Sequence, residues 1–500
     1  MELNDHHLFR RIRQYLNEHR LLVLVLSIAI VVWYWVFLLA AMDFIDGGSR
    51  PYRAVWNGYG SFDLFGFTIN YSFEGYLDYD YYYYNWGQQF LKGFMPYTDA
   101  FDHSEINGFI YNTPYFFPPL FVYMCTLGSV LPIDPFGIGF LITLFGFLTA
   151  FPIYGISLYL SQNLRVAVIA AATYLFNPVV LYYTVFEWLN PAPFVFFMML
   201  SFYLLMRGNR IAGTLAMVTS ALFKQTAFFL AIPLIAYLLK RAPVTEPEDP
   251  EDGKRPPGDE LDLKGFVKII LVVLVFVVAF SLPYIFDIRN YIYYILERPG
   301  GFLLNDLTDF PNASQPITFA VLLIAIGAPE PLIQIVNIAT YYSIMLVIAI
   351  IPILALMLLQ VKDDRNLQGY WRRILFLTLL LMLCIHLFSP RGIYKYYCVA
   401  LIPFFSIQPV SQMISLKTER AKVSLFMILI PLILGFLILI PNRNVYLAFL
   451  LLTLVGYIAF NHFGLVHGLF KEQISHLRRN LSVIGSKELE FEDSDIDQNE

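Results

Sequence analysis

The stretch from Leu21 to Met42, LLVLVLSIAIVVWYWVFLLAAM, decides the fold class of this chain. It carries no charged residue and is longer than the roughly 18 apolar residues that a helix needs to cross a bilayer. The chain as a whole is 58% hydrophobic and 14% charged, whereas a soluble domain carries about 25% charged residues. We therefore expect an all-α polytopic membrane protein. Further apolar runs lie at Ile138–Leu160, Ile269–Phe286, Ile333–Leu359 and Val445–Phe460.

Basic residues set the expected orientation, because the cytoplasmic side of a membrane protein holds the excess of Lys and Arg. Several Arg residues precede Leu21, so residues 1–20 should be cytoplasmic and the first run should be a signal anchor. The basic loops at Arg207–Arg210 and Lys240–Lys268 fall on the same side if two apolar blocks do not cross fully. These blocks are Gly108–Leu131, which holds three prolines, and Ile317–Ile326. About 12 full crossings then remain, in a fold of 12 to 14 transmembrane helices.

The charge pattern also divides the chain into segments. Residues between 242 and 265 are rich in Pro, Glu and Asp, which is typical of disorder. The expected segments are a cytoplasmic N-terminus (1–20), a first transmembrane helix (21–42), a large extracytoplasmic loop with short interfacial helices (43–113), a first set of transmembrane helices (114–241), a disordered cytoplasmic loop (242–265), further transmembrane helices (266–466) with an extracytoplasmic loop at 287–316, and a cytoplasmic acidic tail (467–500).

The polar segment that follows the first span is the main candidate for a site. It reads GYLDYDYYYYNWGQQFLKGFMPYTDAFDHSEINGFIYNTPYFFPPL from Gly75 to Leu120. Near apolar walls a carboxylate such as Asp78 or Asp80 can act as a general base, because burial raises its pKa. The alternative is a solvated acidic loop. The aromatic residues Tyr81–Tyr84 and Trp86 suit sugar or isoprenoid stacking, and they equally suit the aromatic belt of a membrane surface.

Three cations are candidates for binding a lipid phosphate. Lys224 lies between two short apolar runs, where an intramembrane Lys is a functional candidate by default. Arg391 and Lys395, in SPRGIYKYY, are four residues apart and would share one helical face. The alternatives are a snorkelling Lys for the first and interfacial anchoring for the other two.

Metal and redox chemistry find little support in the sequence. Cys125, Cys384 and Cys398 lie in apolar stretches without CxxC or zinc spacing, so we expect them to be packing residues. The pair Asp78 and Asp80 has no nearby histidine and would make a poor cage for a divalent cation. We therefore expect no metal and no cofactor.

The polar segment resembles the first outer loop of GT-C glycosyltransferases, in the branch that uses polyprenyl-phosphate mannose. The resemblance rests on Asp78 before a Tyr/Trp cluster, on Gly93-x-x-Pro96-Tyr97-x-Asp99, and on Pro118-Pro119-Leu120. Downstream it extends to Asn177-Pro178 and Glu187, and it covers residues 78 to about 240. The sequence departs from the family in that Asp78 and Asp80 compete for the place of the family's Asp. It also lacks the Glu that precedes the Pro-Pro element in many relatives.

This resemblance implies a GT-C fold and a membrane glycosyltransferase. Such an enzyme transfers a hexose such as mannose from a polyprenyl-phosphate donor to a lipid, glycan or protein acceptor on the extracytoplasmic face. Asp78 or Asp80 would be the base, and Lys224, Arg391 and Lys395 would hold the donor phosphate. The resemblance further implies acceptor or sugar-binding roles for Tyr84, Trp86, Asp99 and Glu187.

A second hypothesis is a transporter or flippase of lipid-linked sugars. It predicts charged residues along a path through the spans, whereas here the spans are nearly free of charge. A third is a structural or assembly protein, for which single outer carboxylates would not matter. The sequence offers no sign of nucleic-acid binding, and it favours a prokaryotic cell membrane as the location.

Overall fold

The computed structural model describes residues 19–46, 59–72, 75–76, 78–106, 109–110, 113–239, 261–298, 303, 318–360, 367–412, 425–459 and 471. It divides the chain into a large compact unit, Met1–Ala448, and a smaller one, Phe449–Glu500. Most of the expected N-terminus, the loop 242–265 and the tail 467–500 therefore lie outside the described residues, as does most of the loop 287–316.

The large unit begins with one long helix and a set of short elements. In chain order these are α2 (Arg20–Asp46), the strands β1 (Tyr59–Leu64) and β2 (Phe67–Ser72), the π-helix η1 (Asp78–Tyr83), α3 (Tyr84–Leu91), α4 (Asp99–Asp102), the strands β3 (Glu105–Ile106) and β4 (Phe109–Ile110), and α5 (Pro119–Ser129). The strands form two separate antiparallel pairs, β1 with β2 and β3 with β4.

Helices make up the rest of the described chain. They are α6 (Gly137–Leu148), α7 (Ala150–Ser161), α8 (Leu164–Leu175), α9 (Pro178–Val180), η2 (Leu181–Phe186), α10 (Pro191–Met206), α11 (Arg210–Phe223), η3 (Gln225–Leu230), α12 (Ala231–Leu239), α13 (Leu263–Ile285), α14 (Ile288–Ile292), η6 (Tyr293–Glu297), α15 (Phe319–Ala325), α16 (Glu330–Tyr341), α17 (Ile344–Gln360), α18 (Leu367–Phe388), η7 (Lys395–Ala400), α19 (Ile402–Gln412), α20 (Leu425–Leu437) and α21 (Arg443–Tyr457).

The helices identify an integral membrane protein. In the described chain, four helices are long and apolar enough to cross a bilayer, and two further bent pairs raise this number to six. The four are Arg20–Ile45, Gly137–Ser161, Leu263–Ile285 and Gln368–Phe388. The expected 12 to 14 transmembrane helices are not reached by this measure, because five other apolar helices have only 10–17 residues. A helix of 15 residues spans about 22 Å, less than the roughly 30 Å of a hydrocarbon core.

The apolar blocks Gly108–Leu131 and Ile317–Ile326 were expected not to cross the membrane fully, and each contains a short helix. The first contains α5, which has 11 residues and begins at Pro119, and the second contains α15, which has seven. Proline suits the first turn of a helix, because the missing N–H would have no partner there. The prolines of the first block therefore start a short helix.

Local sequence explains where the helices near the site begin. Asn163 caps α8 by accepting hydrogen bonds from the N–H groups of Arg165 and Val166. Asn177 caps α9 by accepting a hydrogen bond from the backbone N–H of Val179. Its Nδ2 donates to the carbonyl of Pro431 at 2.8 Å. The Asn177-Pro178 element thus starts a helix and ties it to α20.

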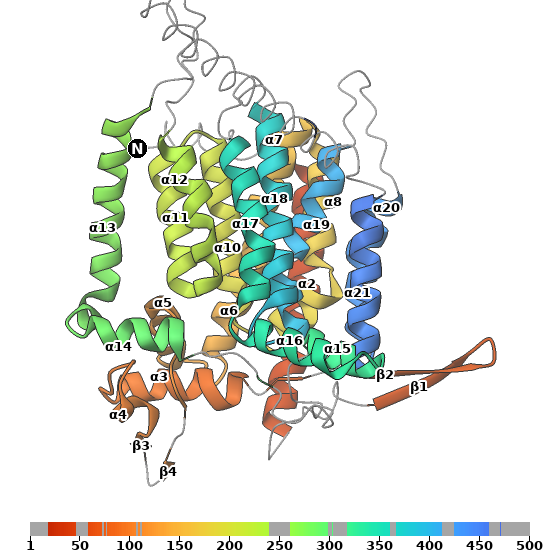
Figure 1. The fold of residues 1–500 in the computed structure, drawn as a ribbon, viewed down its shortest axis with the longest axis horizontal. Coiled ribbons are helices and arrows are strands. Elements are labelled where there is room, and N and C mark those ends of the chain that lie inside the picture. The colour runs from red at the N-terminus through yellow and green to blue at the C-terminus, as the bar shows by residue number, and fades with distance from the viewer. Residues whose placement is uncertain are drawn as a thin grey trace, which may run out of the picture. The chain divides into compact units, whose positions relative to one another are not determined.

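One end of the helices, which we call the α3 side, carries the short elements (Figure 1). There α3 packs on α5. Gly87 allows the close approach of α3, because a Cβ at this position would lie 2.8 Å from the carbonyl oxygen of Cys125. This contact fixes α3, and with it the preceding π-helix η1, against the ends of the helices.

Candidate functional site

Asp78 opens the π-helix η1 on the α3 side. Its side chain is half-buried. Burial raises the pKa of the Asp78 carboxyl to about 6, although Arg391 and Lys224 act in the opposite direction. Both cations are therefore close enough to Asp78 to change its protonation.

Lys224 lies at the turn between α11 and η3. Its Nζ donates a hydrogen bond to Oδ1 of Asn190 at 2.8 Å and lies 4.8 Å from the ring centre of Tyr397. Asn190 is itself held in place, because its backbone N–H donates to the hydroxyl of Tyr83 at 3.3 Å. Asn190 precedes Pro191, the first residue of α10, so a helix start positions the acceptor that orients Lys224.

Arg391 follows α18 and approaches the same place from the C-terminal half of the chain. Its guanidinium carbon lies 4.7 Å from the ring centre of Phe116, which is the geometry of a cation–π contact. The carbonyl of Phe116 accepts a hydrogen bond from Nε2 of Gln225 at 3.2 Å. Gln225, the neighbour of Lys224, and Arg391 therefore both contact Phe116.

These residues form what we call the Lys224 cluster, namely Asp78, Phe116, Asn190, Lys224, Arg391 and Tyr397. Within the part of the chain that the structure describes, Asp78 makes no hydrogen bond or ion pair with either cation. The cluster therefore combines two cations and one carboxylate whose charges act on one another without closing into an ion pair.

The other candidate residues lie differently. Asp80 belongs to η1, but its side chain is outside the described residues. Lys395 is only 1% exposed, and its Nζ donates to the carbonyls of Ile438 at 3.2 Å and Ile440 at 2.8 Å. Its backbone N–H donates to the hydroxyl of Tyr76 at 3.1 Å. Lys395 therefore links η7 to the residues that follow α20, and its ammonium group already donates two hydrogen bonds within the protein.

Glu187 and Tyr84 also take part in contacts within the protein. Glu187 is buried, and its Oε2 accepts a hydrogen bond from the backbone N–H of Tyr76 at 3.2 Å. Tyr84 donates from its hydroxyl to Oδ2 of Asp134 at 3.2 Å. Glu187 thus anchors the segment that leads into Asp78.

Trp86 is not placed to stack on a sugar. It has no exposed surface, its Nε1 donates to the carbonyl of Thr113 at 3.0 Å, and it packs edge-on against Tyr115. The expectation that it binds sugar is corrected on this point, because a large aromatic side chain in this segment is more stable inside the protein. Its role is to hold α3 against the loop that leads to α5.

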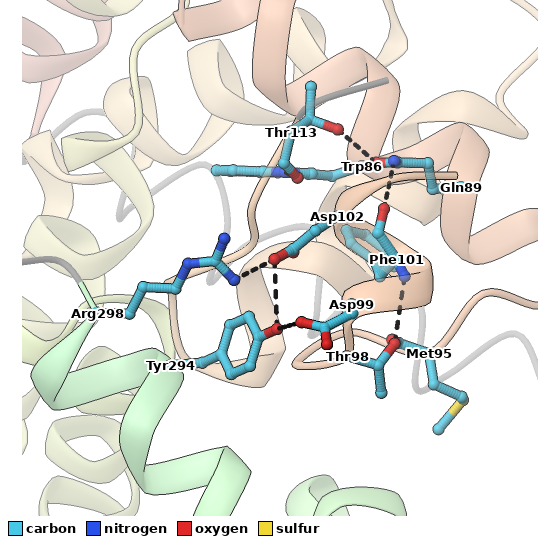
Figure 2. A network of polar contacts seen from close by, with 10 residues as sticks. All are labelled: Trp86, Gln89, Met95, Thr98, Asp99, Phe101, Asp102, Thr113, Tyr294 and Arg298. Atoms are coloured by element: carbon cyan, nitrogen blue, oxygen red, sulfur yellow. Dashed lines mark hydrogen bonds and ion pairs between the residues drawn. The ribbon is translucent and has the colours of Figure 1, made fainter. Parts of the chain in front are cut away.

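A second group of charges lies on the α3 side, and we call it the Asp102 network (Figure 2). The buried carboxylate of Asp102 forms an ion pair with Arg298 and accepts a hydrogen bond from the hydroxyl of Tyr294 at 3.3 Å. The same hydroxyl lies 3.1 Å from Oδ1 of Asp99. Asp99 therefore belongs to a network that joins α4 to η6.

Neutral side chains brace this network from within. Gln89 donates from Nε2 to the carbonyl of Phe101 at 2.8 Å, and its Oε1 accepts from Thr113 at 3.0 Å. Thr98 caps α4 by accepting from the N–H of Phe101. Figure 2 shows these contacts surrounding Asp102. The network thus joins α4 to α3 through Gln89 and to η6 through Tyr294.

Sequence reasoning missed Asn190 as the partner of Lys224, and Asp102 as the partner of Arg298. A signal existed for the first, since an Asn directly before a Pro is a common helix start. None existed for the second, because Asp102 and Arg298 are almost 200 positions apart. As for metals, no group of three or more His, Cys, Asp and Glu side chains that could hold an ion occurs among the described residues.

Comparison with known proteins shows a regional similarity. The family model described as PIG-U, GPI transamidase subunit, matches residues 103–298, which is less than half of the chain. The matched region contains Lys224 and Asn190 but not Asp78 or Arg391. No curated protein matches this sequence.

This match corrects the function that the sequence suggested. The family is described as a transamidase subunit, and not as a glycosyltransferase or a transporter. The GT-C resemblance, the mannosyltransferase activity and the polyprenyl-phosphate-sugar donor were therefore wrong, as was the transporter alternative. A prokaryotic cell membrane and an extracytoplasmic active site are not supported either, whereas an integral membrane protein is. The chain is an all-α membrane protein with regional similarity to a GPI transamidase subunit.

Proposed function

We propose that this chain is a membrane-embedded subunit of a transamidase complex that acts on a GPI-type lipid, and that the Lys224 cluster binds a phosphate of the lipid head group. The family match supports the complex and the class of lipid. One observation carries the binding role. Lys224 and Arg391 approach one place from two distant parts of the chain, and among the described residues neither forms an ion pair.

The chemistry of the two cations fits a phosphate. Arg presents a planar fork that matches phosphate oxygens, and Lys adds a compact charge. Both side chains are half-buried, so an interaction with an anion is screened less than it would be in water. Asn190 and Phe116 hold the two cations in position before a ligand arrives, which lowers the cost of binding.

Binding of the lipid, and not the transfer step itself, is the role that we propose for this subunit. Transamidation requires a nucleophile that a protein substrate can reach. Cys398 lies 3.7 Å from Nε2 of His386, but the two residues are only 3% and 2% exposed. Cys125 is also buried, in the short helix α5, and Cys384 is half-buried within the membrane-spanning helix α18. The reactive group would come from another subunit, and this chain would present the lipid to it.

The test is a lipid-binding measurement on the full-length protein in micelles of a maltoside detergent, which carries no phosphate that could compete. Purified GPI glycolipid would be titrated against the wild type, Lys224→Met and the matched control Lys268→Met, whose lysine is exposed on α13. We expect Lys224→Met to weaken binding by about tenfold or more, since a hydrogen bond to a charged group contributes about 1.5–3 kcal/mol. The control should bind like the wild type.

Two results would overturn the proposal. Equal binding by Lys224→Met and wild type would remove the cluster from lipid recognition. Transamidation by the purified chain alone, measured as transfer of a peptide to an amine, would show that the subunit is itself catalytic.

A further inference from the structure

The strands β1 and β2 form a hairpin with two chemically different faces. In their register Phe62 pairs with Ile69 and Leu64 pairs with Phe67, whereas the alternating positions pair polar residues with one another. Successive side chains of a strand point to opposite faces, so each face collects one kind of side chain. The polar pairs are Ser61 with Asn70 and Asp63 with Thr68.

The apolar face is exposed. Phe62 is 50% exposed, Leu64 is 44% exposed and Phe67 is 74% exposed. On the polar face, Thr68 donates a hydrogen bond to Asp63 at 2.7 Å. An isolated two-stranded hairpin is marginally stable in water, so an exposed apolar face of this kind needs a cover.

The turn at the tip of the hairpin has a strained backbone at Phe65. Phe65 has φ of +50° and the following Gly66 has φ of +85°, which are the conformations of a two-residue type I′ turn. Glycine accepts this backbone, but a phenylalanine does so at a cost of about 1–2 kcal/mol. Phe65 is 93% exposed, so packing within the described chain does not compensate for it. Its side chain is the most exposed part of the apolar face.

The chain on either side places the hairpin at the membrane surface. Ser72 ends β2 only four residues before Tyr76, which limits the distance between them to about 14 Å. The backbone N–H of Tyr76 donates a hydrogen bond to Glu187 at the end of η2. The hydroxyl of Tyr76 accepts a hydrogen bond from the backbone N–H of Lys395 at the start of η7. On the other side, the hairpin follows the membrane-spanning helix α2, whose last turns expose Met42 and Ile45.

We propose that the hairpin is a membrane anchor, which lies in the interface of the bilayer on the α3 side with its apolar face and Phe65 in lipid. A lipid surface fits the composition of this face better than a protein does. The face offers Phe, Leu and Ile, with Tyr71 beside Phe62 at one end, and aromatic side chains of this kind gather at membrane surfaces. It offers no Trp or Arg, which are enriched at the centres of protein interfaces. The polar pairs contain no Lys or Arg, so the anchor does not depend on anionic head groups and should bind neutral lipid.

The test places spin labels on both faces of the hairpin in the full-length protein, reconstituted in vesicles of neutral phosphatidylcholine. Phe62→Cys and Ile69→Cys report on the apolar face, and their neighbours Ser61→Cys and Asn70→Cys are the matched controls. Wild type gives the background, since two of its three cysteines are buried. The measurement is the accessibility of each label to oxygen, which concentrates in lipid, relative to a nickel complex, which stays in water.

We expect the ratio of oxygen to nickel accessibility to be several-fold higher at 62 and 69 than at 61 and 70, at both low and high salt. Equal ratios on the two faces, with all labels open to water, would overturn the proposal. Labels at 62 and 69 that are closed to both reagents would also overturn it, because this result indicates a covering protein. A requirement for anionic lipid would contradict the neutral character of the anchor.

Discussion

The Lys224 cluster and the Asp102 network contain the same kinds of side chain but differ in whether their charges form ion pairs. Both lie on the α3 side and combine basic residues, carboxylates and aromatic rings: the Asp102 network has one cation and two carboxylates, and the Lys224 cluster has two cations and one carboxylate. In the Asp102 network the ion pair with Arg298 and the hydrogen bond from Tyr294 close around one buried carboxylate. In the Lys224 cluster the charges influence one another but, among the described residues, do not pair.

This difference separates a structural group of charges from one that is available to a ligand. A buried carboxylate needs its partner, because an uncompensated charge inside a protein is strongly destabilising. Half-buried cations without an ion pair can form charge-assisted hydrogen bonds to a phosphate. Both groups contain charges, so the presence of charge does not distinguish them. The absence of an ion pair among the described residues is what indicates the Lys224 cluster as the one that binds a ligand.

The largest expected effect tests the closed network. Arg298→Ala leaves the carboxylate of Asp102 buried without its cation, so we expect a loss of about 3–5 kcal/mol in the free energy of unfolding. The measurement is thermal unfolding in detergent, with Arg289→Ala as control because Arg289 is exposed on the neighbouring helix α14. Equal unfolding temperatures for the two variants would show that the network contributes nothing to stability.

The next effect tests the open cluster. Arg391→Met should weaken the binding of GPI glycolipid by about tenfold to a hundredfold, through the loss of a charged hydrogen bond to phosphate. Its unfolding temperature should stay near that of the wild type, since the guanidinium forms no ion pair among the described residues. A variant that unfolds early and binds normally would place Arg391 with the structural residues.

Lys395 sharpens the comparison because it is close in sequence to Arg391 but is bonded within the protein. Lys395→Met should destabilise the fold by about 1–3 kcal/mol, because the carbonyls of Ile438 and Ile440 lose their donor. Lipid affinity measured on the folded fraction should be unchanged. A loss of affinity without a loss of stability would return Lys395 to the binding site.

The smallest effect concerns the carboxylate of the open cluster. The pKa of Asp78 is about 6, so its negative charge disappears as the pH falls through this value. A lipid phosphodiester keeps its charge over the same range, and we therefore expect affinity to rise by roughly fivefold, about 1 kcal/mol, between pH 7.5 and pH 5. Asp78→Asn should bind more tightly at pH 7.5 and show a smaller rise on acidification. The rise that remains comes from Lys224, because burial lowers the pKa of its ammonium group to about 7 and the group gains charge over the same range. Affinity that falls on acidification would contradict the arrangement.

The fold class could be predicted from sequence because hydrophobic length is a local property. Leu21–Met42 lies within the described helix α2, and the proline-rich block before Leu131 yields only the short helix α5. The number of crossings could not be predicted as well. Many apolar blocks form helices of 10–17 residues, and composition alone does not show where a turn divides a block.

The site was predictable only in part. Lys224 and Arg391 stood out as cations in apolar surroundings, and the structure brings both to Asp78. What sequence could not show is which charges are already paired, because Arg298 and Lys395 find their partners through the fold. The glycosyltransferase hypothesis is contradicted by the family match over residues 103–298. It rested on a loop of tyrosines and acids, in which Trp86 is wholly buried and Asp99 contacts Tyr294.

The most direct test of the central claim compares two lipids on the wild-type protein. GPI glycolipid and a glycosyl diacylglycerol without phosphate would be titrated against the full-length chain in micelles of a maltoside detergent, which contributes no phosphate of its own. If the open cations are a phosphate site, the phosphate-bearing lipid should bind at least about tenfold more tightly. Equal affinity for the two lipids would contradict the account, because the Lys224 cluster would then have no part in selecting the ligand.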